Sequence, residues 1–164
     1  MAAEVLESIR RLLRESGVPF REVHHEPTRT SEESARARGE SIEIGGKALL
    51  MKVGEEHAVF VVSAARKVDS GAIRRALGVR RLRFASGDEL MELTSLVPGS
   101  VPPFGEPILP FALYADASVF LNDRIAFNAG SLTDSVIMSV ADWERLAQPT
   151  RLRFSTDGRT EALP

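Results

Sequence analysis

The chain has 164 residues, 43% of them hydrophobic and 27% charged, and a formal net charge of −2 at pH 7. This length fits a single globular domain with its own core, and this charge excludes a protein that is basic overall, as many nucleic-acid binders are. The sequence contains no cysteine, which excludes disulfides, thiolate nucleophiles and thiolate metal sites and fits a reducing cytoplasm.

The sequence pattern gives no sign of a membrane protein. The longest apolar run, Ile108–Tyr114, contains Pro110 and is much shorter than the roughly 20 residues that a membrane-spanning helix needs. Charged side chains interrupt the first 18 residues, so no signal peptide is expected there. We therefore expect a cytoplasmic protein with no membrane partner.

The first part of the chain predicts two helices separated by an extended segment. Apolar residues of the first helix recur at helical spacing: Val5, Ile9, Leu12 and Leu13. Gly17 can end this helix in a left-handed conformation, and residues 18–27 then predict extended chain. Thr30 or Ser31 can cap a short second helix that ends at Gly39.

The middle of the chain predicts a β-hairpin, a helix and another strand. Residues 47–53 and 58–64 are rich in β-branched and aliphatic residues and flank a short polar turn, as in a hairpin. Asp69 can cap a helix that ends before Gly78, and residues 80–85 then predict the next strand.

The last part of the chain predicts two helices and several strands around a loop rich in proline and glycine. Ser86 and Glu89 have the spacing of a capping box at the start of a helix, and the loop follows at Pro98–Gly105. A final helix is expected around Trp143. Four further stretches have strand composition: residues 109–115, 124–129, 135–140 and 150–154.

These elements predict an α+β fold, because helices and strands do not alternate in a strict βαβ order. We expect a single domain over residues 1–155, with a mixed, mostly antiparallel sheet flanked by helices. Residues 156–164 have the composition of a C-terminal tail, which should fray.

The histidines give little support for catalysis or metal binding. His24 and His25 are adjacent, so in an extended segment they point to opposite faces, and His57 falls in the predicted hairpin turn. No histidine has a second ligand at helical spacing, so no metal site is expected. The sequence also lacks the motifs of serine hydrolases, P-loops and dinucleotide-binding proteins.

Lys47 is a candidate functional residue because it follows two glycines and opens a uniformly apolar strand. A lysine at the mouth of a buried strand can hold an anion or polarise a carbonyl while its stem packs against apolar neighbours. The alternative is a lysine that only extends to solvent from the end of a strand.

The loop Pro98–Gly105 is either a linker or a rigid binding surface. Its prolines fix φ, and its remaining N–H groups can then donate to a carboxyl or ester group. Val101 and Phe104 argue against a flexible linker, which would be polar. Phe127–Ser131 places small and polar residues at the end of another strand, where the alternative is an ordinary turn.

A basic stretch lies in the middle of a chain that is otherwise slightly acidic. Between residues 66 and 83 there are seven arginines and lysines but only one acidic residue, Asp69. A phosphate backbone could bind such a patch, and the alternative is a solvated helix and strand edge.

Several of these stretches together resemble the YbaK/ProX family of aminoacyl-tRNA editing domains, the free-standing relatives of the insertion domain of bacterial prolyl-tRNA synthetases. The matching stretches occur in family order from about His25 to Trp143: HEPTRTSEESARARG, GKALLMKV, ELMELTSLVPGSVPPFG, YADASVF and IAFNAGSLTDSVIMSVADW. The resemblance implies an α+β fold around a mixed sheet and hydrolysis of the ester in a wrongly charged aminoacyl-tRNA. It implies no metal and no organic cofactor.

The resemblance also assigns roles to residues. Lys47 matches the functional lysine of the family, and Gly99 and Pro103 match its substrate-fencing G-x-x-x-P loop, so these three are the expected catalytic residues. We expect the substrate to contact residues of this loop and of the later strand end: Ser100, Val101, Pro102, Asn128, Gly130 and Ser131. We expect the tRNA to contact four basic residues: Arg66, Lys67, Arg74 and Arg75.

The predicted function is a trans-editing hydrolase that removes a small amino acid from mischarged tRNA, with tRNA-Pro as a candidate. The ester is already activated, so water can attack it without a nucleophilic side chain. Asn128 falls where some branches of the family carry histidine and others serine, which leaves the recognised amino acid open. Prolyl-tRNA synthetase is a candidate partner, and a monomer or weak homodimer is expected.

Two alternatives remain open at this point. The first is a non-catalytic tRNA- or synthetase-binding module with the same fold. The second is a hydrolase of small activated esters that does not act on tRNA.

Overall fold

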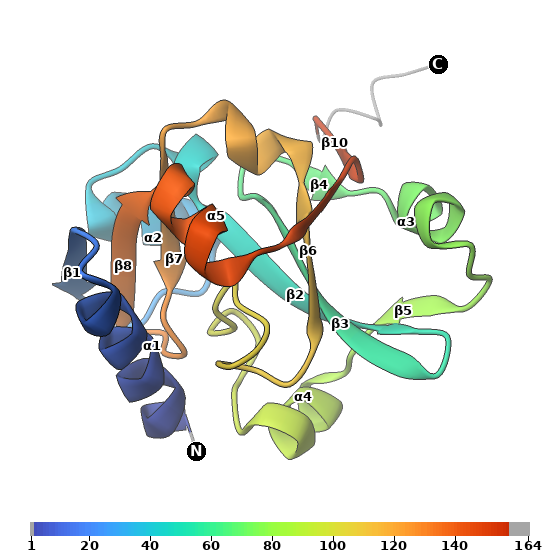
Figure 1. Cartoon of the computed structure of the whole chain (residues 1–164), viewed down its shortest axis with the longest axis horizontal. Coiled ribbons are helices and arrows are strands. Elements are labelled where there is room, and N and C mark those ends of the chain that lie inside the picture. Colours follow the sequence, from blue (N-terminus) through green and yellow to red (C-terminus); the bar gives the residue numbers. More distant parts are fainter. Residues whose placement is uncertain (1, 158–164) are drawn as a thin grey trace.

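The computed structural model describes residues 2–157 and contains five α-helices over this range (Figure 1). They are α1 (Ala2–Ser16), α2 (Ser31–Arg38), α3 (Ser70–Leu77), α4 (Gly87–Thr94) and α5 (Val140–Ala147). Two short 3-10 helices are η1 (Ile42–Ile44) and η2 (Ala117–Leu121). The strands are β1 (Phe20–His24), β2 (Gly46–Val53), β3 (Glu56–Ser63), β4 (Lys67–Val68), β5 (Leu82–Phe84), β6 (Ala112–Asp116), β7 (Arg124–Asn128), β8 (Asp134–Ser139), β9 (Thr150–Leu152) and β10 (Ser155–Thr156).

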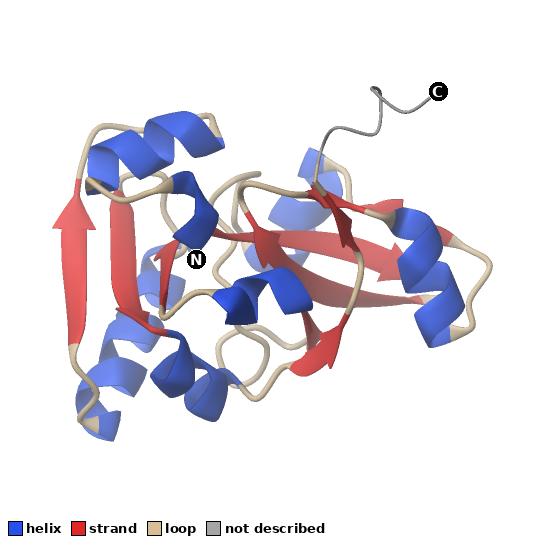
Figure 2. Cartoon of the chain, turned by 90° about the horizontal axis from the view of Figure 1, so that it is seen from above, coloured by secondary structure: helices blue, strands red, loops and turns tan. Residues whose placement is uncertain are grey.

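The strands form two main sheets and one short ribbon. The larger sheet has the order β5-β2-β3-β6-β9, antiparallel from β5 to β3 and parallel from β3 to β9. The smaller sheet, β1-β8-β7, is antiparallel throughout, and β10 pairs with β4. Seen from above, the smaller sheet has helices on both of its sides (Figure 2). The predicted α+β fold with mostly antiparallel pairing is confirmed.

The later strands divide between the two sheets. β6 belongs to the larger sheet, and β7 and β8 belong to the smaller one. The reason is η2, whose N-cap Asp116 accepts a hydrogen bond from the Ser118 N–H and turns the chain between the two sheets.

The helix ends follow the local signals in the sequence. The Thr30 hydroxyl accepts a hydrogen bond from the Glu33 N–H at the start of α2, and Gly39 ends that helix with φ of 71°. Asp69 caps α3 in the same way, and Ser86 opens α4 with a capping box. Such caps satisfy N–H groups that have no partner within the helix.

The C-terminal strand begins just where the tail was expected. Thr156 lies opposite Lys67 in the β10–β4 ribbon, and the residues after 157 lie outside the described part of the chain. The ribbon is anchored by Asp116, which is 2% exposed and accepts hydrogen bonds from the Phe154 N–H at 2.6 Å and the Ser155 hydroxyl at 2.7 Å.

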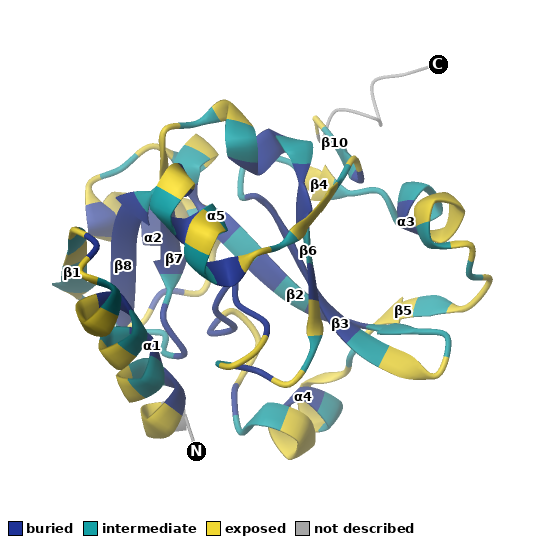
Figure 3. Ribbon diagram, in the orientation of Figure 1, coloured by how far each residue is buried: buried dark blue, intermediate teal, exposed yellow. Residues whose placement is uncertain are grey.

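The core consists of two apolar clusters on opposite faces of β2 and β3. Successive side chains of a strand alternate between faces, so Ala48 and Leu50 join the larger cluster while Met51 joins the smaller one. The larger cluster also takes residues from β7, β8 and α5, and the smaller one is closed by α3. Buried residues accordingly concentrate in the strands, while the helices keep an exposed side (Figure 3).

The two glycines before Lys47 bring the two main sheets together. Gly45 forms a parallel bridge with Ala126 of β7. A Cβ atom on Gly46 would lie only 2.6 Å from Cδ1 of Ile125, which is itself buried. Only glycine permits this approach, which fixes the start of β2 against β7 and therefore fixes the position of Lys47.

Replacing Gly46 with alanine should lower the free energy of unfolding by about 1–3 kcal/mol, because the added methyl group overpacks the contact with Ile125. Urea denaturation measures this change. The control is Gly54→Ala, where the added Cβ meets no atom within 4 Å and only the left-handed φ of 61° is strained. Equal stability of the Gly46 variant and the native chain would contradict the close approach.

Candidate active site

A cavity of about 330 Å³ lies between α2, the start of β2 and the loop that precedes Val101. Its floor is formed by the glycines and first residues of β2, from Gly45 to Leu49. One wall carries hydroxyl groups from α2 and the segment before it: Thr28, Thr30, Ser31 and Ser34. The opposite wall is formed by Pro98, Gly99, Val101 and Asn128.

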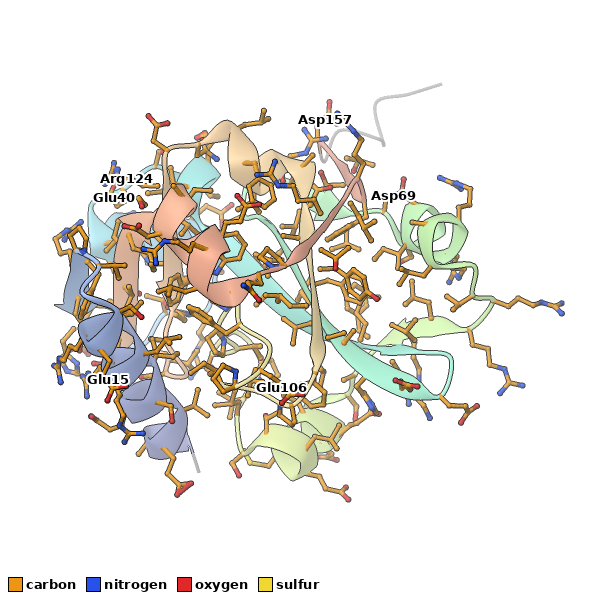
Figure 4. The ribbon with its side chains drawn as sticks, viewed as in Figure 1. Glu15, Glu40, Asp69, Glu106, Arg124 and Asp157 are labelled. Carbon is orange, nitrogen blue, oxygen red and sulfur yellow. The ribbon has the colours of Figure 1, made fainter. Side chains whose placement is uncertain are left out.

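Helix α2 is tied to the smaller sheet at its C-terminal end. Glu40 pairs with Arg124 of β7 at 2.8 Å and with Arg21 of β1, also at 2.8 Å. Figure 4 shows Glu40 and Arg124 side by side above β7 and β8. The Glu40 carboxylate is only about one-tenth exposed, so this three-charge cluster is better shielded from solvent than an ordinary surface pair. It holds the end of α2, where Arg38 lies, against the strands.

Lys47 is half-buried and lines the cavity. Burial lowers the pKa of its ammonium, while the negative charge of Glu32 raises this pKa and the positive charge of Lys67 lowers it further. Within the part of the chain that the structure describes, Lys47 forms no ion pair. Its charge is therefore available to a bound group.

Arg38 is the second cation of the cavity, and it is 8% exposed. Its Nε donates to the Ser135 hydroxyl at 3.0 Å, and its Nη2 donates to Oδ1 of Asn128 at 3.1 Å. Burial lowers the pKa of Arg38 to about 10. Among residues 2–157 no carboxylate pairs with this guanidinium, whose remaining N–H groups have no protein acceptor there. A buried positive charge without an anion is costly, which indicates a role toward a ligand.

Asn128 connects Arg38 to the loop. Its Oδ1 accepts from Arg38, and its Nδ2 donates to the Gly99 carbonyl at 2.7 Å. Exchanging the amide O and N would put two donors or two acceptors face to face, so these contacts fix the orientation of the amide. His25 joins the same network through its Nε2, which lies 2.8 Å from the Ser135 hydroxyl.

The loop is held rigid by contacts within itself and with α5. The Ser100 hydroxyl donates to the Val97 carbonyl at 2.8 Å, and the indole N–H of Trp143 donates to the Pro103 carbonyl at 2.9 Å. The N–H groups of Gly99 and Val101 have no acceptor among the described residues. The Gly105 N–H has no acceptor there either, but Gly105 does not line the cavity, so Gly99 and Val101 supply the two available donors beside it.

The structure therefore brings together some of the predicted site residues and not others. Lys47, Gly99, Val101 and Asn128 line the cavity. The other predicted members do not line it: Ser100, Pro102, Pro103, Gly130 and Ser131.

Each of these five has a structural contact that accounts for its position. The buried residues of the loop support it on the side away from the cavity: Ser100, Pro102 and Pro103. Gly130 packs against Val5, since a Cβ there would lie 2.8 Å from a Val5 methyl carbon. The Ser131 hydroxyl donates to Asp134 at 2.8 Å.

Sequence reasoning missed Arg38 and the hydroxyl groups of α2. One signal was present: Ser34, Ala35 and Arg38 lie on one face of a short helix, and the small residues of that face leave space beside the arginine. The partners of Arg38 lie 90 and 97 residues later in the chain, at Asn128 and Ser135, and no local pattern reveals them.

The four basic residues expected to contact tRNA lie in three different settings. Arg66 is used inside the fold, since its Nε donates to the Ser155 hydroxyl at 2.7 Å and so holds β10. Lys67 is exposed on β4 and close enough to act on the pKa of Lys47. Arg74 and Arg75 lie on α3, away from the cavity wall.

Over residues 2–157 the structure has no cluster of three or more histidine, aspartate or glutamate side chains placed to hold a metal ion. No described helix combines the length and apolar character needed to cross a bilayer.

Known proteins resemble this chain over most of its length. Residues 25–146 match the family model described as the aminoacyl-tRNA editing domain. The Multifunctional Ser/Thr-tRNA deacylase ProXp-y of Escherichia coli strain K12 is 38% identical over 149 residues, which are 87% of this chain and 88% of that protein. The Prolyl-tRNA editing protein ProX of Acetoanaerobium sticklandii is 24% identical over 77% of this chain and 80% of that protein.

Solved structures share the fold. A structure described as a candidate trans-editing enzyme for prolyl tRNA synthetase superimposes with a TM-score of 0.80 at 23% identity, covering 93% of this chain and 97% of that one. The hypothetical protein APE2540 gives a TM-score of 0.78 at 21% identity, covering 90% of this chain and 99% of that one.

The matched region contains every residue that lines the cavity, and the class of protein that the fold and the comparisons define is a hydrolase of aminoacyl esters. The chain belongs to the aminoacyl-tRNA editing domain family. The predicted YbaK/ProX membership is confirmed, and so is the predicted class of function, an aminoacyl-tRNA deacylase.

Proposed function

We propose that this chain removes serine or threonine from mischarged tRNA by hydrolysing the aminoacyl ester in the cavity between α2 and Gly99. The observation that carries this choice is the composition of the cavity lining, in which hydroxyl-bearing residues of α2 and of the segment before it accompany Arg38. Among them the hydroxyls of Thr28 and Ser34 bond to each other, and that of Thr30 caps α2. The relative with 38% identity carries the name Ser/Thr-tRNA deacylase, which supports the same choice.

The reaction needs positioning and charge stabilisation rather than a covalent intermediate. Water attacks the ester carbonyl carbon, the bond to the ribose oxygen breaks, and the products are a free amino acid and a ribose hydroxyl that takes up a proton. Negative charge develops on the carbonyl oxygen during the attack. Preorganised donors and nearby cations stabilise such a charge.

Each group of the cavity has a part in this scheme. Lys47 holds the terminal phosphate or sugar of the tRNA through its unpaired ammonium. The free N–H groups of Gly99 and Val101 donate to the carbonyl oxygen. Arg38 adds positive potential at the same place and keeps Asn128 bonded to Gly99, so that the loop keeps its shape.

A polar wall favours a hydroxyl-bearing amino acid for a definite reason. A site that hydrogen-bonds a substrate hydroxyl rejects an analogue without it, because buried polar groups are then left unpaired. Val101 and Pro98 limit the size of the side chain from the other side. Alanine should therefore be removed more slowly than serine.

The partners follow from the substrate. The tRNA is the macromolecular partner, and Lys67, Arg74 and Arg75 are exposed cations that we propose to contact it. Prolyl-tRNA synthetase is a candidate partner because the family includes prolyl-tRNA editing proteins. We place the protein in the cytoplasm, where these substrates occur, as a monomer or weak homodimer.

The test is a panel of tRNAs mischarged with serine, threonine, alanine or cysteine, together with the same tRNAs carrying their own amino acid. We expect rapid loss of the serine and threonine esters, slower loss of alanine and no loss of the correct amino acid. Binding of these tRNAs without ester loss would contradict the proposal and favour a non-catalytic binding module. Hydrolysis of small activated esters without hydrolysis of any aminoacyl-tRNA would also contradict it.

The pH dependence of the rate tests the charge on Lys47. Burial lowers the pKa of this lysine below its ordinary value, so its positive charge is lost as the pH rises through the lowered pKa. We expect kcat/KM, corrected for spontaneous hydrolysis, to fall as the pH rises, before the ordinary pKa of a lysine is reached. Lys47→Arg should move this fall to higher pH. A rate that instead rises over the same range would show that a neutral amine acts as a base.

A further inference from the structure

A second hollow, of about 360 Å³, lies at the opposite end of β2 from Lys47. It is formed by the turn between β2 and β3, the helix α3 and the segment that leads into β5, on the side of the molecule where β5 and α3 lie in Figure 1. Five basic residues line it: Lys52, Arg74, Arg80, Arg81 and Arg83. We call this hollow the basic groove, and Glu55 is the acidic residue on its wall.

Most of these cations lack a counter-charge. Arg83 is the exception, because it pairs with Glu89 at 2.8 Å. Hydrogen bonds from Arg83 and His57 lower the pKa of the Glu89 carboxyl to about 2, so the carboxylate stays charged and the ion pair persists. Within residues 2–157 the other four, Lys52, Arg74, Arg80 and Arg81, form no ion pair. Like charges gathered around one hollow repel each other, and a bound anion would relieve this repulsion.

The groove is built on elements that hold its cations in place. Lys52 lies opposite Arg83 in the pairing of β2 with β5. The Gly54 N–H donates to the Arg81 carbonyl at 2.9 Å, which ties the segment before β5 to the hairpin turn. Strand pairing, this turn contact and α3 therefore fix the backbones of four of the cations, and Arg80 precedes Arg81 in the same segment. The exposed side chains of Arg80 and Arg81 can adapt to a ligand.

The groove lies at a short distance from the cavity. Lys47 and Lys52 are five residues apart on the same strand, which corresponds to about 17 Å at about 3.3 Å per residue. Lys67, which acts on the pKa of Lys47, is a further cation beside the cavity. Because this separation is an odd number of residues, the two side chains leave β2 on opposite faces, so a polyanion with one end in the cavity passes around the edge of β2 to reach the groove.

We infer that the basic groove binds backbone phosphates of the double-stranded acceptor stem while the aminoacyl end of the same tRNA lies in the cavity. This inference rests on the proposed function. Several unpaired arginines around an open hollow suit the successive phosphates of a duplex better than one small anion, since each phosphate contacts few donors. The groove positions the stem and reads no base sequence.

The experiment measures KM and kcat for two substrates, with the native chain and with the double variant Arg80→Ala/Arg81→Ala. One substrate is full-length seryl-tRNA, and the other is the seryl ester of the trinucleotide CCA, which has no stem. We expect KM for the full-length tRNA to rise about tenfold with kcat unchanged, and both constants for the trinucleotide to stay the same. The salt dependence of tRNA binding should also lose about two units of slope.

The matched control is Arg11→Ala with Arg14→Ala, which removes two exposed arginines from α1 and keeps the same net charge as the test variant. We expect this control to behave like the native chain toward both substrates. An equal loss of tRNA affinity in both double variants would show that only the total charge matters, and would overturn the inference. An unchanged KM for tRNA in the groove variant would overturn it as well.

A binding measurement separates this inference from the proposed function. Uncharged tRNA needs no hydrolysis, so its affinity for the native chain and the groove variant can be compared even if no ester is cleaved. Weaker binding by the groove variant, together with equal binding of CCA, supports the groove whatever the fate of the deacylase proposal. Lys52→Gln should give a smaller change in the same direction, and no change in either variant would reject the groove.

Discussion

Replacing Lys47 with alanine should lower kcat/KM for seryl-tRNA by about 10²–10³-fold, which corresponds to about 3–4 kcal/mol of lost transition-state stabilisation. The reason is that Lys47 is a half-buried cation on the cavity wall with no ion pair among the described residues, so its charge is free to act on the substrate. The free energy of unfolding should change by no more than about 1 kcal/mol, because no protein contact depends on the ammonium.

Two variants control this result. Arg36→Ala removes an exposed cation from α2 close to the cavity, and it should leave kcat/KM within about twofold of the native value. Lys47→Arg keeps the charge and should retain more activity than Lys47→Ala. If Lys47→Ala hydrolyses seryl-tRNA at the native rate, Lys47 has no part in the reaction.

Replacing Arg38 with methionine should reduce kcat/KM by about 10–10²-fold, with most of the loss in kcat. Arg38 donates to Asn128, and Asn128 in turn donates to the Gly99 carbonyl, so the loop loses one of its supports when the guanidinium is removed. The positive potential beside the developing oxyanion is lost at the same time.

The stability of this variant distinguishes the role of Arg38 from a purely structural one. Burial lowers the pKa of Arg38 to about 10, so the fold holds this charge at a cost, and methionine removes that cost while it fills similar space. We expect the free energy of unfolding to fall by less than about 1 kcal/mol. Arg38→Lys should restore the part of kcat/KM that depends on the positive charge. It cannot restore the part that depends on donating to both Ser135 and Asn128, as the guanidinium does. A large loss of stability with an unchanged rate per folded molecule would contradict a role in the reaction.

The sequence was sufficient for the features that depend on neighbouring residues. The N-cap at Thr30 and the capping box at Ser86 are local hydrogen bonds, and the structure forms both. The two glycines and the apolar run after them marked Lys47 as the first residue of a buried strand, and the structure adds that these glycines bring the two sheets together. The stiffness of the loop from Pro98 to Gly105 was equally visible in its prolines.

Features that depend on distant parts of the chain could not be predicted in the same way. The carbonyl of Pro103 is taken by Trp143, forty residues later. Arg66 looked like a surface cation, but it donates to Ser155 at the far end of the chain. These contacts exist only after the sheets and α5 have assembled.

The central claim is that the aminoacyl end of the tRNA lies between α2 and the loop at Gly99. The most direct measurement is the binding of a non-hydrolysable seryl-adenosine amide, followed residue by residue through the backbone amide chemical shifts of the isotope-labelled protein. The account predicts that the largest changes fall in residues 28–47, 98–101 and 128, and that the N–H signals of Gly99 and Val101 move most within the loop. Changes confined to other surfaces, with these signals unmoved at saturating ligand, would contradict it.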